Sequence, residues 1–304
     1  MKKSSSLLFF GSGPVALKSL EYLSTLYDIE GVITKPKAVK QKDTPLVINW
    51  AITHKVPYHT VASKAELDTL FTNLTPASRV GIVVDFGIII SNMVIESFDL
   101  GIINSHFSLL PKLRGADPIS FAILEGLTET GVSLMKIVPA LDEGPLLAQR
   151  AITISPSITE PELTNTLIEL SCELFKEYLP KYISGELNTY EQDVSKGATY
   201  TRKLTKQDGI IDWQDTAQDI ERQVRTFLQW PKSRTHLGEY DVIITKVSLS
   251  PVRLKPGTVQ VVQGELLIGT ATEAIKIDEL KPAGKGAMSA KSFLAGYSIP
   301  TKVS

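Results

Sequence analysis

The first half of the chain alternates short apolar runs, rich in β-branched and aromatic residues, with stretches that have helical spacing. This alternation is typical of a parallel sheet whose strands are joined by crossover helices. Strands are predicted at residues 7–10, 30–34, 80–86, 101–104 and 132–138. Helices are predicted at residues 14–26, 45–54, 64–73 and 116–125. Together they predict an α/β domain with a doubly wound, Rossmann-like, mostly parallel sheet.

The rest of the chain has a different pattern. A long helix, predicted at residues 160–184, is followed by a polar stretch without helical or strand period, so a linker is expected at residues 186–203. After one more helix, at about 216–227, come strand-like runs at residues 242–249, 258–262, 265–269 and 274–280. Several short strands with turn signals predict a small OB-like β-barrel. The predicted domains are therefore residues 1–185 and 204–304.

Composition excludes several classes of protein. The chain is 43% hydrophobic and 21% charged, with a mean hydropathy of +0.06, which is typical of globular rather than disordered or fibrous proteins. No apolar run reaches the roughly 18 residues that span a bilayer, and the run after Lys3 is too short for a signal peptide. A cytoplasmic location is therefore expected. The single cysteine, Cys172, is expected to be a buried core thiol.

Basic residues cluster although the net charge is only −1. From Arg222 to the end there are 12 Lys and Arg residues against 6 Asp and Glu residues. A second cluster lies in one predicted loop and comprises Lys35, Lys37, Lys40 and Lys42. Either cluster alone could simply be a charged surface exposed to solvent, but the two together make nucleic acid a candidate partner.

Polar residues end two of the apolar runs. Asn104 and His106 close the run that begins at Gly101, and an extended backbone places their side chains on the same face. Ligands of open α/β sheets bind outside the carboxyl ends of strands, so these two residues predict a reaction centre, with a structural histidine as the alternative. Asp142 lies in a Leu-Asp-Glu-Gly turn after another strand, where a structural role alone would also explain it.

A loop punctuated by Pro and Gly follows His106 directly. It reads Ser-Leu-Leu-Pro at 108–111 and Arg-Gly-Ala at 114–116. In combination with Asn-x-His and Leu-Asp-x-Gly, these motifs resemble the 10-formyltetrahydrofolate-dependent formyltransferases. The resemblance implies direct transfer of a formyl group from the folate N10 to an amine, through a tetrahedral intermediate and without a metal ion.

The resemblance also implies a catalytic trio of Asn104, His106 and Asp142. The transfer needs a donor for the oxyanion, a group that receives the amine proton and a group that protonates the leaving nitrogen. We expect Asn104 to be the oxyanion donor, His106 the proton donor and electrostatic stabiliser, and Asp142 the partner that tunes His106 and relays protons. The loop at 140–142 is also expected to hold the pterin. The other implied folate-binding residues are Ser108, Leu109, Leu110, Pro111, Phe86, Gly87, Ile88 and Ile89.

Three motifs in the last hundred residues bear on the acceptor. They begin at Lys203-Leu-Thr-Lys, Arg225-Thr-Phe and Leu280-Lys-Pro-Ala-Gly-Lys, and they resemble the carboxyl domain of the family's methionyl-tRNA formyltransferases. The resemblance implies initiator methionyl-tRNA as the acceptor, for translation initiation, and we expect a monomer. A basic barrel can hold RNA phosphates without reading bases. The candidate tRNA contacts are Lys35, Lys37, Lys40, Lys42, Lys281, Lys285 and Lys291, with Arg253 and Lys255 as weaker candidates.

The chain departs from the family pattern in four places. The first turn reads Gly-Ser-Gly-Pro at 11–14 instead of Gly-Thr-Pro, and the basic loop at 35–42 has lysines but no arginine. Lysine lacks the planar fork with which arginine would grip an RNA end. Asp85 and Asp117 introduce acidic groups where the family has alanine and a small residue.

Three other functions remain open at this point. A sugar-nucleotide formyltransferase, acting on an amino sugar, shares the catalytic motifs. An NAD(P)-dependent oxidoreductase is suggested by Gly-x-Gly-x-x-Ala at 11–16, but the acidic residue expected at the end of the second strand is missing. A nonenzymatic RNA-binding protein would explain the basic clusters but leaves the trio without a role.

Overall fold

The computed structural model describes residues 6–38 and 43–303. The chain divides into two compact units. The first comprises the residues up to Pro118 together with Glu129–Thr153 and Thr164–Thr201. The second comprises Ile119–Thr128, Ile154–Leu163 and the residues from Arg202 onward.

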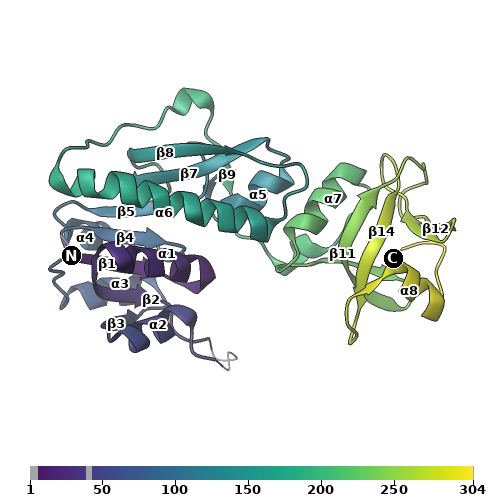
Figure 1. Cartoon of the computed structure of the whole chain (residues 1–304), viewed down its shortest axis with the longest axis horizontal. Helices are drawn as coiled ribbons and strands as arrows, with labels where there is room; N and C mark the ends of the chain where they lie inside the picture. The colour runs from purple at the N-terminus through teal and green to yellow at the C-terminus, as the bar shows by residue number, and fades with distance from the viewer. Residues whose placement is uncertain (1–5, 39–42, 304) are drawn as a thin grey trace. The chain divides into compact units, whose positions relative to one another are not determined.

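A seven-stranded sheet forms the centre of the first unit, in the order β3-β2-β1-β4-β5-β7-β8 (Figure 1). Its strands are β1 (Ser6–Gly11), β2 (Asp28–Thr34), β3 (Tyr58–Thr60), β4 (Gly81–Val84), β5 (Ile102–His106), β7 (Glu129–Lys136) and β8 (Leu146–Thr153). The first five run parallel, whereas β7 and β8 are antiparallel. The predicted doubly wound, mostly parallel sheet is confirmed.

Helices connect the parallel strands of this sheet. They are α1 (Gly13–Leu26), α2 (Leu46–His54), α3 (Lys64–Phe71) and α4 (Asn92–Glu96), whereas the long α6 (Glu160–Ser184) follows β8. The parallel strands are buried on both faces: Phe9, Phe10, Ile82 and Ile102 are fully enclosed. Near-continuous apolar runs are what such strands need, which is why the sequence showed them clearly.

The elements missing from the prediction are short or mixed in polarity. β3 has three residues with only its middle one partly buried, and α4 has five residues. β8 begins with buried Leu146, Leu147 and Ala148 and then becomes polar and half exposed. Such segments are too short or too mixed in polarity for a strand period or a helical period to be recognised.

The second unit is built on an antiparallel sheet, in the order β10-β11-β14-β13-β12, with β15 pairing to β14. Its strands are β10 (Ser233–Leu237), β11 (Tyr240–Leu249), β12 (Val259–Val262), β13 (Glu265–Ile268), β14 (Ile275–Pro282) and β15 (Met288–Ser289). The register between β11 and β14 shifts around Lys246, and such a bulge bends a sheet. The predicted small barrel is confirmed as a curled antiparallel half-barrel.

Three helices belong to the second unit. α7 (Ala217–Thr226) packs on β11, α8 (Ala290–Gly296) packs on β13 and β14, and α5 (Pro118–Leu124) belongs to this unit from Ile119 on. The core includes Phe293, which is fully buried. α8 was not predicted, because it follows directly on a Gly- and Pro-containing stretch. None of the helices in the described ranges is both long and apolar enough for a membrane span.

Candidate active site

His106 is the last residue of β5 and is only 5% exposed. Its Nε2 lies 2.8 Å from the carbonyl oxygen of Leu113. A carbonyl can only accept, so Nε2 carries a hydrogen and donates it. This contact fixes the ring so that Nδ1 faces Asp142, with Oδ2 at 3.6 Å. The distance exceeds a direct hydrogen bond, so the two groups are held as electrostatic partners.

Asp142 lies in the loop between β7 and β8, and its carboxylate is largely buried. The backbone N–H of Gly115 donates to Oδ2 at 2.7 Å, which orients the carboxylate toward the loop that follows His106. Asp142 has φ of 52°, in the left-handed region that non-glycine residues seldom occupy. Such strain clusters at functional sites, and Leu113 (φ 54°) and Asp117 (φ 56°), which follow His106 in the chain, share it.

Asn104 lies two residues before His106 on β5, so the pleat places both side chains on one face. It pairs with Val83 on one side and Met135 on the other. In residues 6–38 and 43–303 its carboxamide has no hydrogen-bond partner, and the residue is partly exposed. The structure therefore brings His106 and Asp142 together and adds an amide donor that is available to a ligand.

The loop at Ser108–Pro111 is held by two polar side chains that the sequence did not reveal as important. The Ser133 hydroxyl donates to the Ser108 carbonyl at 2.6 Å and accepts from the Leu110 N–H at 3.1 Å. The Gln149 carboxamide donates to Ser133 at 2.8 Å and to the Leu110 carbonyl at 2.9 Å. Ser133 is fully buried on β7, and a polar residue within an apolar strand is the signal that could have identified it.

Apolar side chains stand exposed in the two segments expected to hold a pterin. Ile89 is 71% exposed and Leu141 is 59% exposed, whereas Phe86 is buried in the core. Large exposed apolar side chains mark sites where a ligand removes them from water. The residues present therefore fit a flat heterocycle between these segments. Lys35 at the end of β2 also comes close to Gly87.

A hydrogen-bond network around the buried Arg114 and Gln192 includes the backbone of Asp142 and was missed entirely. Arg114, 4% exposed, donates from NH1 to Glu143 Oε1 at 2.8 Å and to the Tyr200 hydroxyl at 2.9 Å. Its NH2 donates to Gln192 Oε1 at 2.8 Å. Gln192 in turn donates to the carbonyls of Asp142 and Gly144. No local pattern could reveal this network, because its members come from three distant segments.

Burial raises the pKa of the Cys172 thiol to about 11, with smaller contributions from Glu169 and Glu173. The thiol stays protonated near neutral pH and is not a nucleophile. This agrees with the expected core role. In the described ranges no group of three or more His, Cys, Asp and Glu side chains could hold a metal ion.

The glycine turn after β1 has a packing role that needs no nucleotide. A Cβ at Gly11 would lie 2.7 Å from the Val84 carbonyl oxygen, so the close approach of β1 and β4 requires glycine. At the end of β2 the Thr34 hydroxyl pairs with Ser12 at 3.2 Å, and Glu30 binds the backbone of Ser78 at the other end. A dinucleotide-binding protein needs a carboxylate at the end of this strand to bind the ribose, and Thr34 stands there instead.

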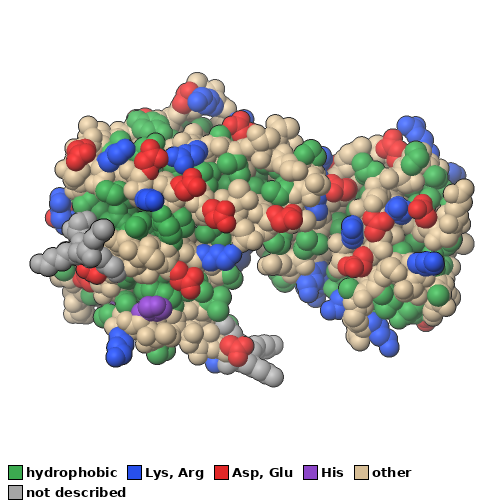
Figure 2. Space-filling model, in the orientation of Figure 1, with side chains coloured by type: hydrophobic (Ala, Val, Ile, Leu, Met, Phe, Trp, Pro, Cys, Tyr) green, Lys and Arg blue, Asp and Glu red, His purple; other side chains and the backbone are tan. Residues whose placement is uncertain are grey.

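A cationic hollow of about 680 Å³ lies in the second unit. Its basic lining residues are Lys206, Lys232, Arg234, His236 and Lys281. Asp241, also in the lining, pairs with His236 at 2.8 Å. Figure 2 shows Lys and Arg side chains (blue) along the lower edge of this unit.

Of the predicted RNA contacts, Lys281 lines this cationic hollow, whereas Lys285 and Lys291 are not among its lining residues. Lys291 lies on α8, and Lys35 and Lys37 belong to the first unit. The weaker candidate Arg253 lies 3.7 Å from Glu273. Two further candidates, Lys40 and Lys42, lie outside the described residues.

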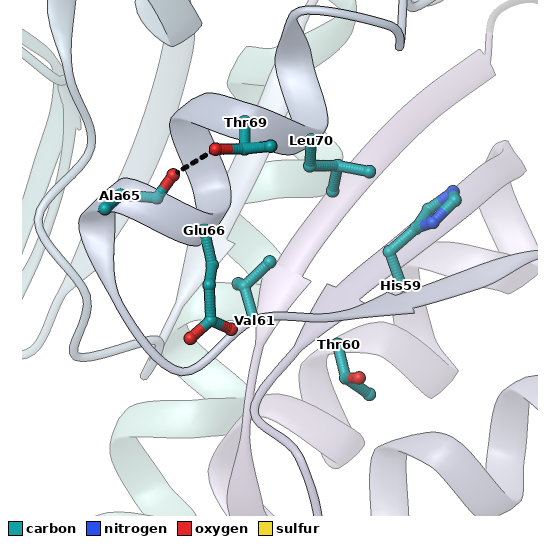
Figure 3. A pocket seen from close by; sticks show the side chains of 7 residues that line it. All are labelled: His59, Thr60, Val61, Ala65, Glu66, Thr69 and Leu70. Atoms are coloured by element: carbon teal, nitrogen blue, oxygen red, sulfur yellow. Dashed lines mark hydrogen bonds between the residues drawn. The ribbon is translucent and has the colours of Figure 1, made fainter.

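A second hollow, of about 450 Å³, lies in the first unit beside β3 and α3. His59 and Glu66 line it, but their side chains point away from each other (Figure 3). The Glu66 carboxylate accepts from the Ala62 N–H at 2.9 Å, so it serves the start of α3. None of the predicted site residues that the structure describes lines this hollow.

Comparison with known proteins shows the family to which the chain belongs. The chain belongs to the formyl transferase family: the formyl transferase model matches residues 20–179, and the model for the formyl transferase C-terminal domain matches residues 203–298. It is 34% identical over 303 residues to the methionyl-tRNA formyltransferase of Chloroflexus aggregans, covering 97% of this chain and 98% of that protein. The methionyl-tRNA formyltransferase of a Geobacillus species is 33% identical over 299 residues, covering 95% and 94%.

Solved structures share the fold. An N-formyltransferase from Helicobacter canadensis, in complex with folinic acid and dTDP-3-aminofucose, has a TM-score of 0.67 at 20% identity, covering 91% of this chain and 99% of that one. HypX from Aquifex aeolicus, in complex with tetrahydrofolic acid, has a TM-score of 0.63 at 16% identity, covering 96% of this chain and 47% of that one. At such identities the likeness extends to the fold alone.

Proposed function

We propose that this chain transfers the formyl group of 10-formyltetrahydrofolate to the α-amine of methionine on initiator methionyl-tRNA. The observation that carries the proposal is the His106–Asp142 pair, together with the Asn104 amide on the same strand β5, which has no hydrogen-bond partner among the described residues. The full-length relatives supply the acceptor, because they are methionyl-tRNA formyltransferases. The proposed acceptor belongs to translation initiation, so a cytoplasmic location goes with it, and a monomer remains the expectation.

The reaction makes one bond and breaks one. The amine attacks the formyl carbon, the bond from that carbon to the folate N10 breaks, and one proton moves from the amine to N10. Asn104 donates to the oxygen on which negative charge develops. A donor of this kind typically contributes about 10²–10³ in rate. The methionyl amine lies beside an ester carbonyl and is less basic than an alkylamine, so no strong catalytic base is required.

His106 and Asp142 handle the proton and the charge. The Leu113 carbonyl engages Nε2, so Nδ1 is the atom that faces Asp142 and the site. An imidazolium there stabilises the developing oxyanion and can protonate the leaving nitrogen. Asp142 balances that positive charge and receives the amine proton, through water where the distance requires it.

The folate co-substrate supplies the formyl carbon and the leaving nitrogen. We assign its binding to the loop at Ser108–Pro111 and to the exposed apolar side chains of Ile89 and Leu141. The hydrogen bonds from Ser133 and Gln149 fix this loop before any ligand arrives. Such preorganisation lowers the entropy that binding must remove.

The cationic hollow of the second unit supports an RNA acceptor. Lys206, Lys232, Arg234 and Lys281 offer four positive groups in a space of about 680 Å³. Phosphate contacts position a nucleic acid without reading its sequence. We therefore add Lys206, Lys232 and Arg234 to Lys281 as the residues that hold the tRNA backbone.

One assay tests the function. The purified protein is incubated with 10-formyltetrahydrofolate and either charged initiator tRNA or an amino-sugar nucleotide, and the formylated product is identified. Formyl-methionine is expected. Formylation of the amino sugar in place of the tRNA would replace the proposal with the sugar-nucleotide alternative.

Two substitutions test the assigned roles. His106→Ala and Asp142→Asn should each lower turnover by at least about 10²-fold while folate binding, measured by calorimetry, is retained. Near-normal turnover in either variant would show that the roles are assigned wrongly.

A further inference from the structure

Residues 186–201, between α6 and the second unit, lie against the loops of the catalytic trio. Tyr190 and Leu146 exchange two backbone hydrogen bonds, of 2.7 and 2.9 Å. Further along, β9 (Tyr200–Thr201) pairs in parallel with β6 (Arg114–Gly115). The segment therefore reaches both the loop that follows His106 and the loop that contains Asp142.

Among the described residues of this segment, Gln192 is the one whose side chain is hydrogen-bonded to the backbone of the Asp142 turn. It is 8% exposed. Its Nε2 donates to the Asp142 carbonyl at 2.7 Å and to the Gly144 carbonyl at 2.9 Å. Its Oε1 accepts from Arg114 NH2 at 2.8 Å.

The neighbours of Gln192 allow only one orientation of its carboxamide. Carbonyl oxygens accept and a guanidinium donates, so a flipped amide would place oxygen against two oxygens and NH₂ against a cation. Arg114 thus selects the orientation in which the Gln192 amide donates to both carbonyls of the turn. The charge of Arg114 is itself balanced by Glu143 at 2.8 Å.

We propose that Gln192 is a positioning residue for formyl transfer: it fixes the backbone of the 142–144 turn and thereby the Asp142 carboxylate beside His106. This rests on the proposed function. The turn needs such a clamp, because Asp142 holds a φ of 52° that an unrestrained aspartate seldom adopts. Gln192 acts through Asp142 and needs no contact with substrate, since its amide is already engaged by Arg114 and the turn.

The experiment uses two near-isosteric replacements in the full chain. Gln192→Glu still accepts from Arg114 but sets an oxygen against both carbonyls, whereas Gln192→Met removes the hydrogen bonds without adding charge. Because a misplacement of about 1 Å can lower a rate about 10²-fold, kcat should fall about 10- to 100-fold in each. The KM for folate should stay within about twofold, since its loop is held by other residues. Gln218→Glu, an exposed change on α7, is the matched control with unchanged kcat.

A double-mutant cycle separates positioning from general destabilisation. If Gln192 acts through Asp142, then Gln192→Met should have little further effect on kcat in an Asp142→Asn background. Multiplying effects would overturn the proposal, as would a near-normal kcat in both single variants. Failure of both single variants to fold, seen by circular dichroism, would also overturn it, in favour of a purely structural role. A wild-type protein that does not formylate methionyl-tRNA would instead refute the proposed function.

Discussion

Gly144 is the residue at which a single added methyl group should disturb the site most. It lies two residues after Asp142, where the turn passes the end of β7. A Cβ at this position would lie 1.7 Å from the Lys136 carbonyl oxygen and 2.9 Å from its carbon. Both contacts are with backbone, which cannot rotate away as a side chain could.

The size of the disturbance follows from these distances. Real Cβ contacts are essentially never under 3.0 Å, so Gly144→Ala must move the turn from Lys136 by about 1.3 Å. β7 is paired on both sides and will hold its place, so the turn moves. The shift strains the hydrogen bond from the Lys136 N–H to the Pro145 carbonyl and the one from Gln192 to Gly144. A displacement of this order lowers rates about 10²-fold, and overpacking typically costs about 1–3 kcal/mol of unfolding free energy.

Steady-state formylation and thermal unfolding are the measurements for Gly144→Ala. We expect kcat to fall about 10²-fold, and the KM for folate to change little, because the loop at 108–111 is held by Ser133 and Gln149. The control is Gly296→Ala, where a Cβ would meet nothing within 4 Å. It should leave kcat unchanged and should not lower Tm, because alanine at a compatible helical position does not destabilise. A Gly144→Ala enzyme with wild-type kcat and Tm would refute the reasoning.

Three further predictions concern the cationic hollow and the buried thiol. Lys281→Glu should raise the KM for tRNA and leave the KM for folate unchanged. The slope of log KM for tRNA against the logarithm of the salt concentration should fall by about one. An unaltered slope would show that Lys281 does not contact the tRNA. Burial raises the pKa of Cys172 to about 11, so iodoacetamide should modify the native protein very slowly near neutral pH and the urea-unfolded protein rapidly. Because the pKa of this thiol is higher in the folded than in the unfolded protein, protonated Cys172 favours the folded state. This contribution to the unfolding free energy is complete below the unfolded pKa of about 8.5 and is lost as pH rises toward 11. Urea melts at several pH values should show this loss in the wild-type protein and not in Cys172→Ala.

The parts of the fold that sequence could predict are those with long, uniform environments. α6 begins at Glu160 and ends at Ser184, the predicted bounds, because its apolar stripe persists over 25 residues. β10 (Ser233–Leu237) alternates buried with more exposed residues over only five positions, four of them polar, and was not predicted. Short and half-buried strands depend on tertiary pairing for their existence, so local sequence carries little sign of them.

The candidate site divides in the same way. Asn104 and His106 could be related from sequence, because two residues on one strand share a face whatever the rest of the chain does. Arg114 and Gln192 could not be related, since 78 positions separate them and their contact depends on the path of the whole segment after α6. The motifs thus predict which side chains react, whereas contacts between residues far apart in the sequence determine how those side chains are positioned.

The geometry also separates the formyl transfer from the choice of acceptor. In the proposed mechanism, Asn104, His106 and Asp142 respond to an oxyanion and a proton, which every amine acceptor generates alike. Nothing in that trio can distinguish an aminoacyl ester from an amino sugar. Discrimination must therefore come from groups that bind the acceptor away from the reacting carbon, such as the cations of the second unit. Charge reversal in the cationic hollow should consequently change which amine is formylated, whereas changes to the trio or to Gln192 should slow every acceptor by the same factor.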